Sequence, residues 1–321
     1  MPAFRPNGEM GVSFSNDEKK LFYLNTQGGV ANIWCITIAD KYGRIIAGPT
    51  NAPVQVTKFT DRSVVRFIHL LGAGEVLFRR LADNGKDYHI YRMKDDGSGS
   101  PQDLTPGADG VTSEIIGASY NGRYVYYTEN KVNRDKLDTY RYDCNQFITD
   151  LVFPNDKDWQ VLAWTRDQKK LLIVNPNPGG YLVSYDIEST ERTPLVSPKG
   201  DAGFTAALLD PSGQQLTMFE GTEQYQMTIG TNVVTHVATG VSWLDYSPNG
   251  KYLVTEQTKK WSVKEIASGA SLDLPDGAQP MAIAQRESML VYSLPAADGK
   301  DLYLYDISKK ASTKLVTIAS K

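Results

Sequence analysis

The sequence predicts an all-β fold, a β-propeller of seven four-stranded blades, from three observations. A two-part pattern recurs seven times, about every 45 residues, which is a period typical of propeller blades. Within each copy, apolar or aromatic residues alternate with others at a period of two, as in half-buried strands. No sustained apolar pattern at i, i+3, i+4 and i+7 indicates a helix, and glycines and prolines interrupt every candidate.

The first half of the pattern is a polar turn that leads into a strand. It is clearest at residues 120–125, YNGRYV, because Asn-Gly reverses a chain at low cost when both residues tolerate positive φ. The last apolar residue of each copy sets the register: Leu21, Val76, Val125, Leu171, Leu216, Leu253 and Leu290. The copy that ends at Val76 is degenerate, so six and eight blades remain alternatives.

The second half is an alternating strand, which in most copies is followed by a turn and a short closing strand. In residues 84–110, YHIYRM alternates, DDGSGS turns and PQDL closes. We therefore expect one propeller domain over residues 1–321, with blades at approximately 11–59, 63–106, 113–153, 158–198, 203–239, 240–276 and 278–318. Each pair of phrases maps to a whole blade, so the ring closes without exchange of a strand between the termini, unless residues 1–10 add one to the last blade.

Composition excludes several classes of partner. The chain has 34 basic and 37 acidic residues, a net charge of −3 and a pI near 5.7, so no strong field favours nucleic acid or anionic lipid. No apolar run reaches the roughly 18 residues of a membrane span, and the first residues show no signal peptide. We expect a cytoplasmic protein if Met1 is native, and a periplasmic or secreted one if a signal peptide was removed. Cys35 and Cys144 are too few for a disulfide framework and read as packed or surface thiols.

The repeat resembles that of known propellers. The phrase SPNGKYL at residues 247–253, the strand DLYLYD at 301–306 and the closing QDLT at 102–105 are similar to TolB-type repeats. They are also similar to the amino-terminal propeller of the prolyl oligopeptidase and dipeptidyl peptidase IV family of serine peptidases, and residues 87–130 resemble the peptidase propellers more than the TolB type. In that family, an α/β-hydrolase domain carries the catalytic Ser, Asp and His, and the propeller restricts entry to short or unstructured peptides.

The catalytic part of that resemblance is missing from this chain. No segment of the chain matches the nucleophile elbow G-x-S-x-G in full. Four segments contain G-x-S but lack the final glycine, around Ser13, Ser119, Ser242 and Ser271. The three histidines, His69, His89 and His236, each stand alone in or near a strand phrase, so we expect ordinary strand or loop histidines. We therefore expect no catalytic residues, no metal site and no cofactor.

Four residues are candidates for contacts with a ligand. Asp61, Arg62 and Arg66 lie at a connection between blades, where charges can line one mouth of the central channel, although a solvated loop explains them as well. Trp159 follows the polar run NDKD and is a candidate for a rim-exposed contact, with packing between blades as the alternative.

Two functions follow as hypotheses. The first is a non-catalytic propeller that gates substrate entry for a covalently linked α/β-hydrolase domain. The alternative is a stand-alone TolB-like propeller that serves as a scaffold for a protein or peptide ligand. An enzyme within this chain is a third reading, and no constellation of residues supports it.

Overall fold

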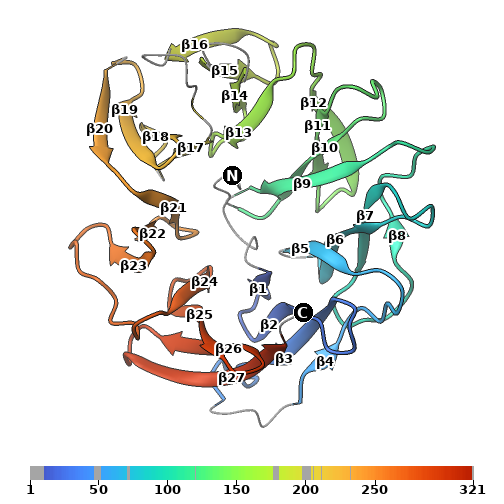
Figure 1. The fold of residues 1–321 in the computed structure, drawn as a ribbon, viewed down its shortest axis with the longest axis vertical. Coiled ribbons are helices and arrows are strands. Elements are labelled where there is room, and N and C mark those ends of the chain that lie inside the picture. Colours follow the sequence, from blue (N-terminus) through green and yellow to red (C-terminus); the bar gives the residue numbers. More distant parts are fainter. Residues whose placement is uncertain are drawn as a thin grey trace.

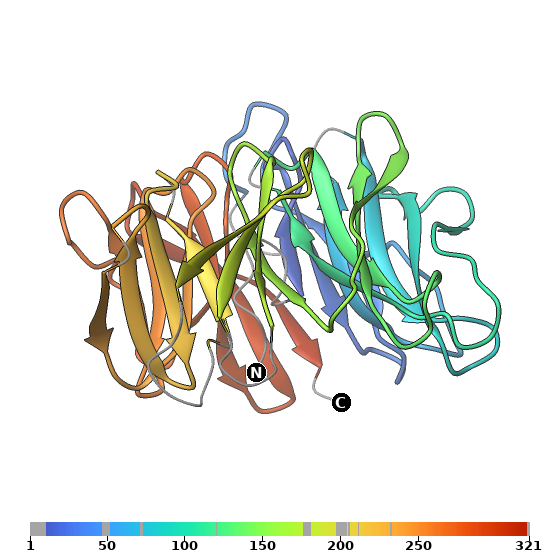
Figure 2. The same ribbon diagram turned by 90° about the horizontal axis from the view of Figure 1, so that it is seen from above.

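Seven small antiparallel sheets follow one another around a ring in the computed structural model (Figure 1). The structure describes residues 11–46, 52–70, 73–119, 121–175, 181–196, 204, 206–210, 212–231 and 233–319, and these contain no helix. Each sheet consists of strands that are consecutive in the sequence, and its first strand is the innermost. Figure 2 shows the ring from the side, with the blades standing around a common axis. The expected seven-bladed propeller is confirmed.

The first three blades have four strands each. Blade 1 contains β1 (Val12–Phe14), β2 (Lys20–Asn25), β3 (Asn32–Thr37) and β4 (Val54–Gln55). Blade 2 contains β5 (Val64–Leu70), β6 (Glu75–Leu81), β7 (Tyr88–Lys94) and β8 (Gln102–Asp103). Blade 3 contains β9 (Ser113–Ala118), β10 (Tyr124–Glu129), β11 (Asp138–Asp143) and β12 (Ile148–Phe153).

The remaining blades follow the same order. Blade 4 contains β13 (Gln160–Trp164), β14 (Lys170–Val174), β15 (Leu182–Asp186) and β16 (Arg192–Val196). Blade 5 contains β17 (Ala206–Leu209), β18 (Gln215–Glu220), β19 (Glu223–Thr228) and β20 (Val234–Ala238). Blade 6 contains β21 (Val241–Tyr246), β22 (Tyr252–Gln257) and β23 (Lys260–Glu265). Blade 7 contains β24 (Gln279–Ile283), β25 (Met289–Ala296), β26 (Gly299–Asp306) and β27 (Ala311–Ala319).

Blade 6 has a reduced outer edge. Its fourth strand is replaced by a single bridge between Lys264 and Ser271, beside the bond from the Leu272 amide to the Val263 carbonyl. Beyond this bridge the chain passes through SLDLPDG, where a proline and a glycine disfavour further pairing. Six blades therefore have the four strands expected, and the sixth has three.

The core lies between the blades. Seven buried apolar clusters are present, and each joins side chains of two neighbouring blades. In β2, for example, Leu21 and Tyr23 pack against blade 7, whereas Phe22 packs against blade 2. Strand alternation thus buries both faces of a blade, one against each neighbour.

The turn after the innermost strand is built alike in most blades. A hydroxyl accepts a hydrogen bond from the amide five residues later, as Ser119 does from Tyr124 at 2.9 Å and Ser247 from Tyr252 at 2.8 Å. In six blades the residue three positions further on donates its amide to the carbonyl of this turn position and has a positive φ, although the position holds a hydroxyl in only four of them and Asp210 and Ala284 in the other two. Glycine meets this requirement in three blades, at Gly122, Gly213 and Gly250. Three other blades place Glu18, Gln168 and Glu287 there.

These three long side chains fasten each blade to the one before it. Gln168 accepts a hydrogen bond from the Tyr126 hydroxyl of blade 3 at 2.8 Å. Glu287 accepts hydrogen bonds from the Ser247 hydroxyl and the Asn249 amide of blade 6. Glu18 accepts one from the backbone of blade 7. All three side chains are buried, where a satisfied hydrogen bond matters most.

Ring closure uses packing and side-chain hydrogen bonds. Blades 1 and 7 share a cluster that includes Val12, Tyr23, Val291 and Leu304. The Thr26 hydroxyl also donates to the Ala319 carbonyl at 3.0 Å. Among the described residues, every sheet is made from one continuous stretch of chain, as the repeat pattern predicted.

Candidate functional site: the central channel

The innermost strands β1, β5, β9, β13, β17, β21 and β24 surround the centre of the ring (Figure 1). The beginnings of these strands mark one end of the central channel, and the turns that follow them mark the other. We name the end where these strands begin the connector mouth, since the connections between blades lead into it. The end where they turn back is the turn mouth. Loops at the ends of a rigid scaffold often carry recognition, so both mouths are candidate sites.

Asp61 and Arg62 lie in the connection that enters β5, at the connector mouth. The Asp61 carboxylate accepts hydrogen bonds from Arg80 at 3.0 and 3.2 Å. Arg62 donates to the Ala82 carbonyl at 2.8 Å and contacts the Asp83 carboxylate at 3.3 Å. These bonds tie the connection to β6, through Arg80, and to the turn between β6 and β7, through Ala82 and Asp83. Both side chains therefore have a structural role at the position the sequence predicted, and their contact with a ligand stays a prediction.

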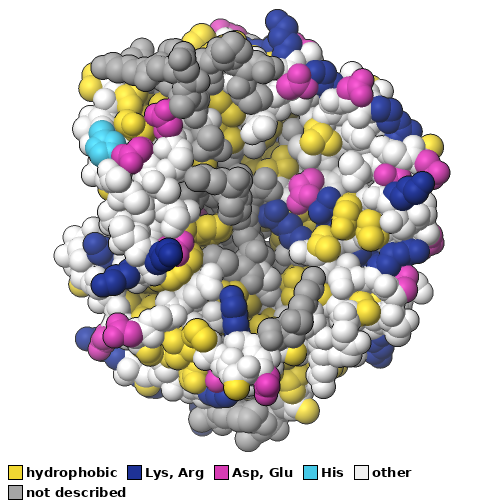
Figure 3. Space-filling model, viewed as in Figure 1, with side chains coloured by type: hydrophobic (Ala, Val, Ile, Leu, Met, Phe, Trp, Pro, Cys, Tyr) yellow, Lys and Arg dark blue, Asp and Glu magenta, His cyan; other side chains and the backbone are white. Residues whose placement is uncertain are grey.

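Arg66 lies on β5, where a β-bulge at Val65 changes the register. The bulge places Arg66 directly opposite Arg79 of β6. The Glu114 carboxylate, from β9 of the next blade, lies between the two guanidinium groups. It is 2.9 Å from the Arg79 Nη1 and 3.7 Å from the Arg66 Nη1. Figure 3 shows basic and acidic side chains gathered beside the central hollow, over β5 and β9.

Arg79 is held in place from three sides. Its Nε donates to the Ser113 carbonyl at 2.7 Å, and its guanidinium lies 3.9 Å from the centre of the Tyr88 ring. Burial lowers the pKa of this guanidinium from its ordinary value, and the charge of Glu114 opposes that shift. Arg79 and Glu114 were missed by sequence reasoning. The available signal was the pair of arginines in the apolar strand phrase EVLFRRL.

Trp159 does not lie exposed on the rim. It is 6% exposed and packs between blades 3 and 4, with Phe153 and Tyr185 in the same cluster. The side chain of Asn155 turns the chain inward here, because it accepts a hydrogen bond from the Trp159 amide and donates one to the Trp159 carbonyl. Of the two roles considered for Trp159, the structure shows packing between blades and not exposure on the rim.

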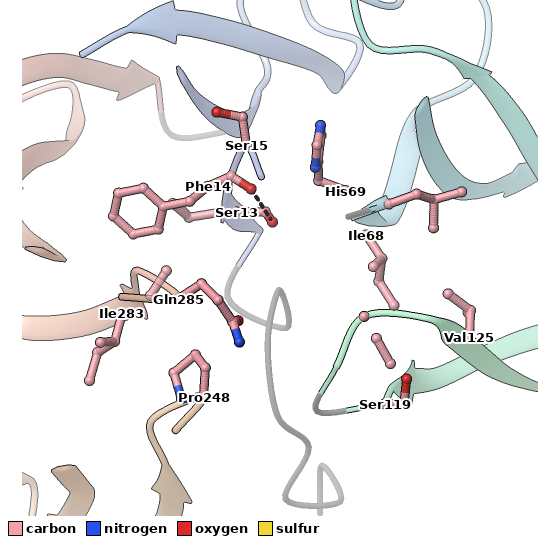
Figure 4. Close-up of a pocket in the computed structure, with 15 residues that line it drawn as sticks. Ser13, Phe14, Ser15, Ile68, His69, Ser119, Val125, Pro248, Ile283 and Gln285 are labelled. Atoms are coloured by element: carbon pink, nitrogen blue, oxygen red, sulfur yellow. Dashed lines mark hydrogen bonds between the residues drawn. The ribbon is translucent and has the colours of Figure 1, made fainter. Parts of the chain in front are cut away.

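A small pocket lies at the turn mouth (Figure 4). Its volume of about 50 Å³ holds a few water molecules, whereas pockets for drug-sized ligands begin at roughly 300 Å³. Ser15, Ser119 and His69 line it, and Asp95 lies 2.9 Å from the His69 Nε2. The Ser15 hydroxyl donates to Asp17 and the Ser119 hydroxyl to Asn121, both within their own turns. These hydroxyls therefore cap turns, and neither donates to the imidazole as a serine nucleophile would.

Each histidine has a carboxylate partner. His69 pairs with Asp95 at 2.9 Å, His89 with Asp103 at 2.7 Å and His236 with Glu223 at 2.7 Å. The bond with His69 lowers the pKa of Asp95 from its ordinary value. Each histidine and its carboxylate partner lie in the same blade, and the three pairs do not converge on one site. The described residues contain no group of three His, Cys, Asp or Glu side chains that could hold a metal ion.

The turn mouth is also crossed by one arginine. Arg166, in the turn between β13 and β14, donates to the Pro248 carbonyl of blade 6 at 3.0 Å. The bond joins blade 4 to blade 6, which are not neighbours in the ring, so this side chain lies across part of the turn mouth. In the part of the chain that the structure describes, no helix is long and apolar enough to cross a membrane.

Comparison with known proteins supports the fold. No protein-family model matches the chain, and no curated protein matches it in sequence. TolB from Acinetobacter baumannii matches with a TM-score of 0.52 and 14% identity, over 78% of this chain and 66% of TolB. An oligogalacturonate lyase in complex with manganese matches with a TM-score of 0.64 and 11% identity, over 95% of this chain and 90% of the lyase. A prolyl endopeptidase matches with a TM-score of 0.62 and 12% identity, over 98% of this chain and 50% of the peptidase.

The chain thus spans less than two thirds of TolB and half of the prolyl endopeptidase. At identities of 11 to 14%, these likenesses concern the fold alone. Together with the seven sheets of the ring, they show that the chain has a seven-bladed β-propeller fold similar to that of TolB and of the propeller region of prolyl peptidases.

Proposed function

We propose that this propeller controls the access of a flexible ligand to an active site carried by an α/β-hydrolase region, and that it carries no catalytic residue itself. The observation that carries the proposal is the likeness to a prolyl endopeptidase, which involves almost all of this chain and half of the peptidase. A ligand that reaches such a site through the channel has to be thin and unfolded, because the channel is bounded by seven close-packed blades.

The side chains of the channel support a gating role over a catalytic one. The hydroxyls of Ser15 and Ser119 are engaged in turns, and His69 is paired with Asp95 in its own blade. Arg166 narrows the turn mouth by its bond to Pro248. A purified protein of residues 1–321 is therefore expected to show no hydrolysis of short peptides.

The first test is the coding sequence on both sides of residues 1–321. A neighbouring α/β segment with a G-x-S-x-G elbow supports the gating role, and its absence on both sides contradicts it. The whole protein then allows a direct test of the path. Replacement of Ser13, which lines the pocket from β1, by tryptophan is expected to slow hydrolysis of a short peptide. The same replacement at the exposed Ser189 is the matched control. Equal rates in the two variants would show that substrate enters by another path.

A second function is a stand-alone scaffold for a protein or peptide partner. The likeness to TolB, of which this chain spans 66%, favours it. Under this alternative, no hydrolase segment adjoins the chain, and the loops of the connector mouth are the first surface to test.

A further inference from the structure

We propose that the connector mouth contains a carboxylate-binding site formed by Arg66 and Arg79, and that Glu114 occupies it when no ligand is bound. The proposal goes beyond the gating role, because it concerns the chemistry of what the channel admits. It holds equally for a gate and for a scaffold.

The first support is the placement of two like charges. Arg66 and Arg79 lie directly opposite each other on adjacent antiparallel strands, where like charges are unfavourable. Most positions of strands β5 and β6 carry apolar residues, so the pair departs from the local pattern. Departures of this kind concentrate at functional sites.

The second support is the geometry of the bound carboxylate. One carboxylate already lies between the two guanidinium groups, close to Arg79 and more loosely placed against Arg66. Arginine presents its donors in a planar fork that matches a carboxylate, so an external carboxylate can replace that of Glu114 on the same donors.

The third support is the difference in exposure. The side chains of Arg66 and Arg79 are 17% and 18% exposed, and that of Glu114 is 39% exposed. Arg79 is held in the wall by the Ser113 carbonyl and the Tyr88 ring, and Arg66 is largely buried beside it. Glu114 is the more exposed partner and can be displaced with less disturbance of the fold. Partly buried ion pairs at such a site are also less screened by salt than surface pairs.

The ligand class follows from these features: a peptide carboxylate, from a chain terminus or an acidic side chain. The test uses the purified protein and isothermal titration calorimetry with three versions of one short peptide. The first has a free carboxyl terminus, the second is amidated, and the third is amidated and carries an internal glutamate. We expect the first to bind at least about tenfold more tightly than the second, since charge-assisted pairs differ from neutral ones by that order. Binding of the third as well identifies any peptide carboxylate, and its failure to bind identifies the terminus.

Variants separate this site from general electrostatics. Arg66→Gln is expected to weaken binding about tenfold or more, and Glu114→Gln to strengthen it about tenfold, because the internal competitor is removed. Lys86→Gln, an exposed position in the same blade, has the same charge change as Arg66→Gln and is expected to bind as the parent does. Unfolding midpoints verify that each variant is folded.

Three results would overturn the proposal. These are equal binding of the acid and the amide, unchanged binding by a folded Arg66→Gln variant, and no gain in Glu114→Gln. Each would leave the gating role intact, since that role is tested by the coding sequence and by the path of the substrate.

Discussion

The Glu18 carboxylate of blade 1 accepts a hydrogen bond of 2.6 Å from the backbone amide of Arg286 in blade 7. The two residues are 268 positions apart, and the bond lies at the junction where the ring closes. Glu18 adopts a φ of 58°, which glycine would adopt without strain. Glu18 is thus a buried acceptor with a strained backbone at the junction of blades 1 and 7. Side-chain packing and side-chain hydrogen bonds join these two blades, which share no described strand pair.

Glu18→Gly is expected to lower the free energy of unfolding by about 1–3 kcal/mol, because the Arg286 amide loses a buried acceptor. Glycine relieves the strain of the positive φ, so a net loss measures the bond between the blades. Urea unfolding gives the value, and Glu18→Gln, which keeps an acceptor oxygen, is the matched control. A Glu18→Gly variant as stable as the parent would show that the bond does not hold the ring closed.

Trp159→Ala is expected to cost about 3–5 kcal/mol, as for other large side chains removed from a core. Trp159 packs between two blades, and its ring meets that of Tyr181 edge to face at 5.5 Å. Tyr181→Ala, at the exposed end of this pair, is expected to cost about 1 kcal/mol, which is the scale of such a ring pair. Similar losses in the two variants would contradict the buried role of Trp159.

The carboxyl group of Asp306 is expected to make the free energy of unfolding depend on pH in the acid range. Burial alone would raise the pKa of its carboxyl group, but hydrogen bonds from Lys309 and Ser308 outweigh it and lower the pKa to about 2. The folded form therefore binds this proton less readily than the unfolded chain, whose ordinary value is 3.8. The carboxylate stabilises the fold above pH 4, and this contribution is lost between about pH 4 and 2.

Urea unfolding at several pH values tests this. Asp306→Asn is expected to be less stable than the parent at pH 5, with a difference that shrinks as the pH approaches 2. Asp276→Asn, at an exposed position, controls for the change in net charge. A constant difference across this range would contradict the role of Asp306.

Both cysteines are expected to be unreactive in the folded protein. Burial raises the pKa of the Cys35 thiol to about 11 and that of Cys144 to about 12, so the thiolate is scarce at neutral pH. Ellman's reagent at pH 8 is expected to detect no fast thiol in the native state and two thiols in urea. One fast native thiol would show that a blade interface opens readily.

The fold was predictable because the repeat is local. The turns and alternating strands of each blade are encoded within about 45 consecutive residues, and the same pattern recurs in all seven copies. The reduced edge of blade 6 was not predictable from the phrases, because the fourth strand of a blade is short and polar in several copies, as in β4 and β8.

The site was less accessible from sequence because it depends on register and on distant partners. Arg66 faces Arg79 only because a bulge shifts the pairing at Val65, and Glu114 comes from the next blade. For Trp159 the charged neighbours left rim exposure open beside packing, and the hydrogen bonds of Asn155 that turn it into the core could not be read from the sequence. The placement of Asp61 and Arg62 followed from the blade connections, which the repeat does define.

The continuity of every blade along the chain has a consequence for engineering. Since no described sheet borrows a strand from another part of the sequence, a circular permutant that begins with blade 2 and ends with blade 1 would keep every strand pair intact. A short linker would then make the junction of blades 7 and 1 covalent, and the new opening would fall between blades 1 and 2, where Phe22 and Phe67 share a core. The molecule could thus be opened at any of its six other interfaces, and the six permutants together with the parent would rank the seven interfaces by strength.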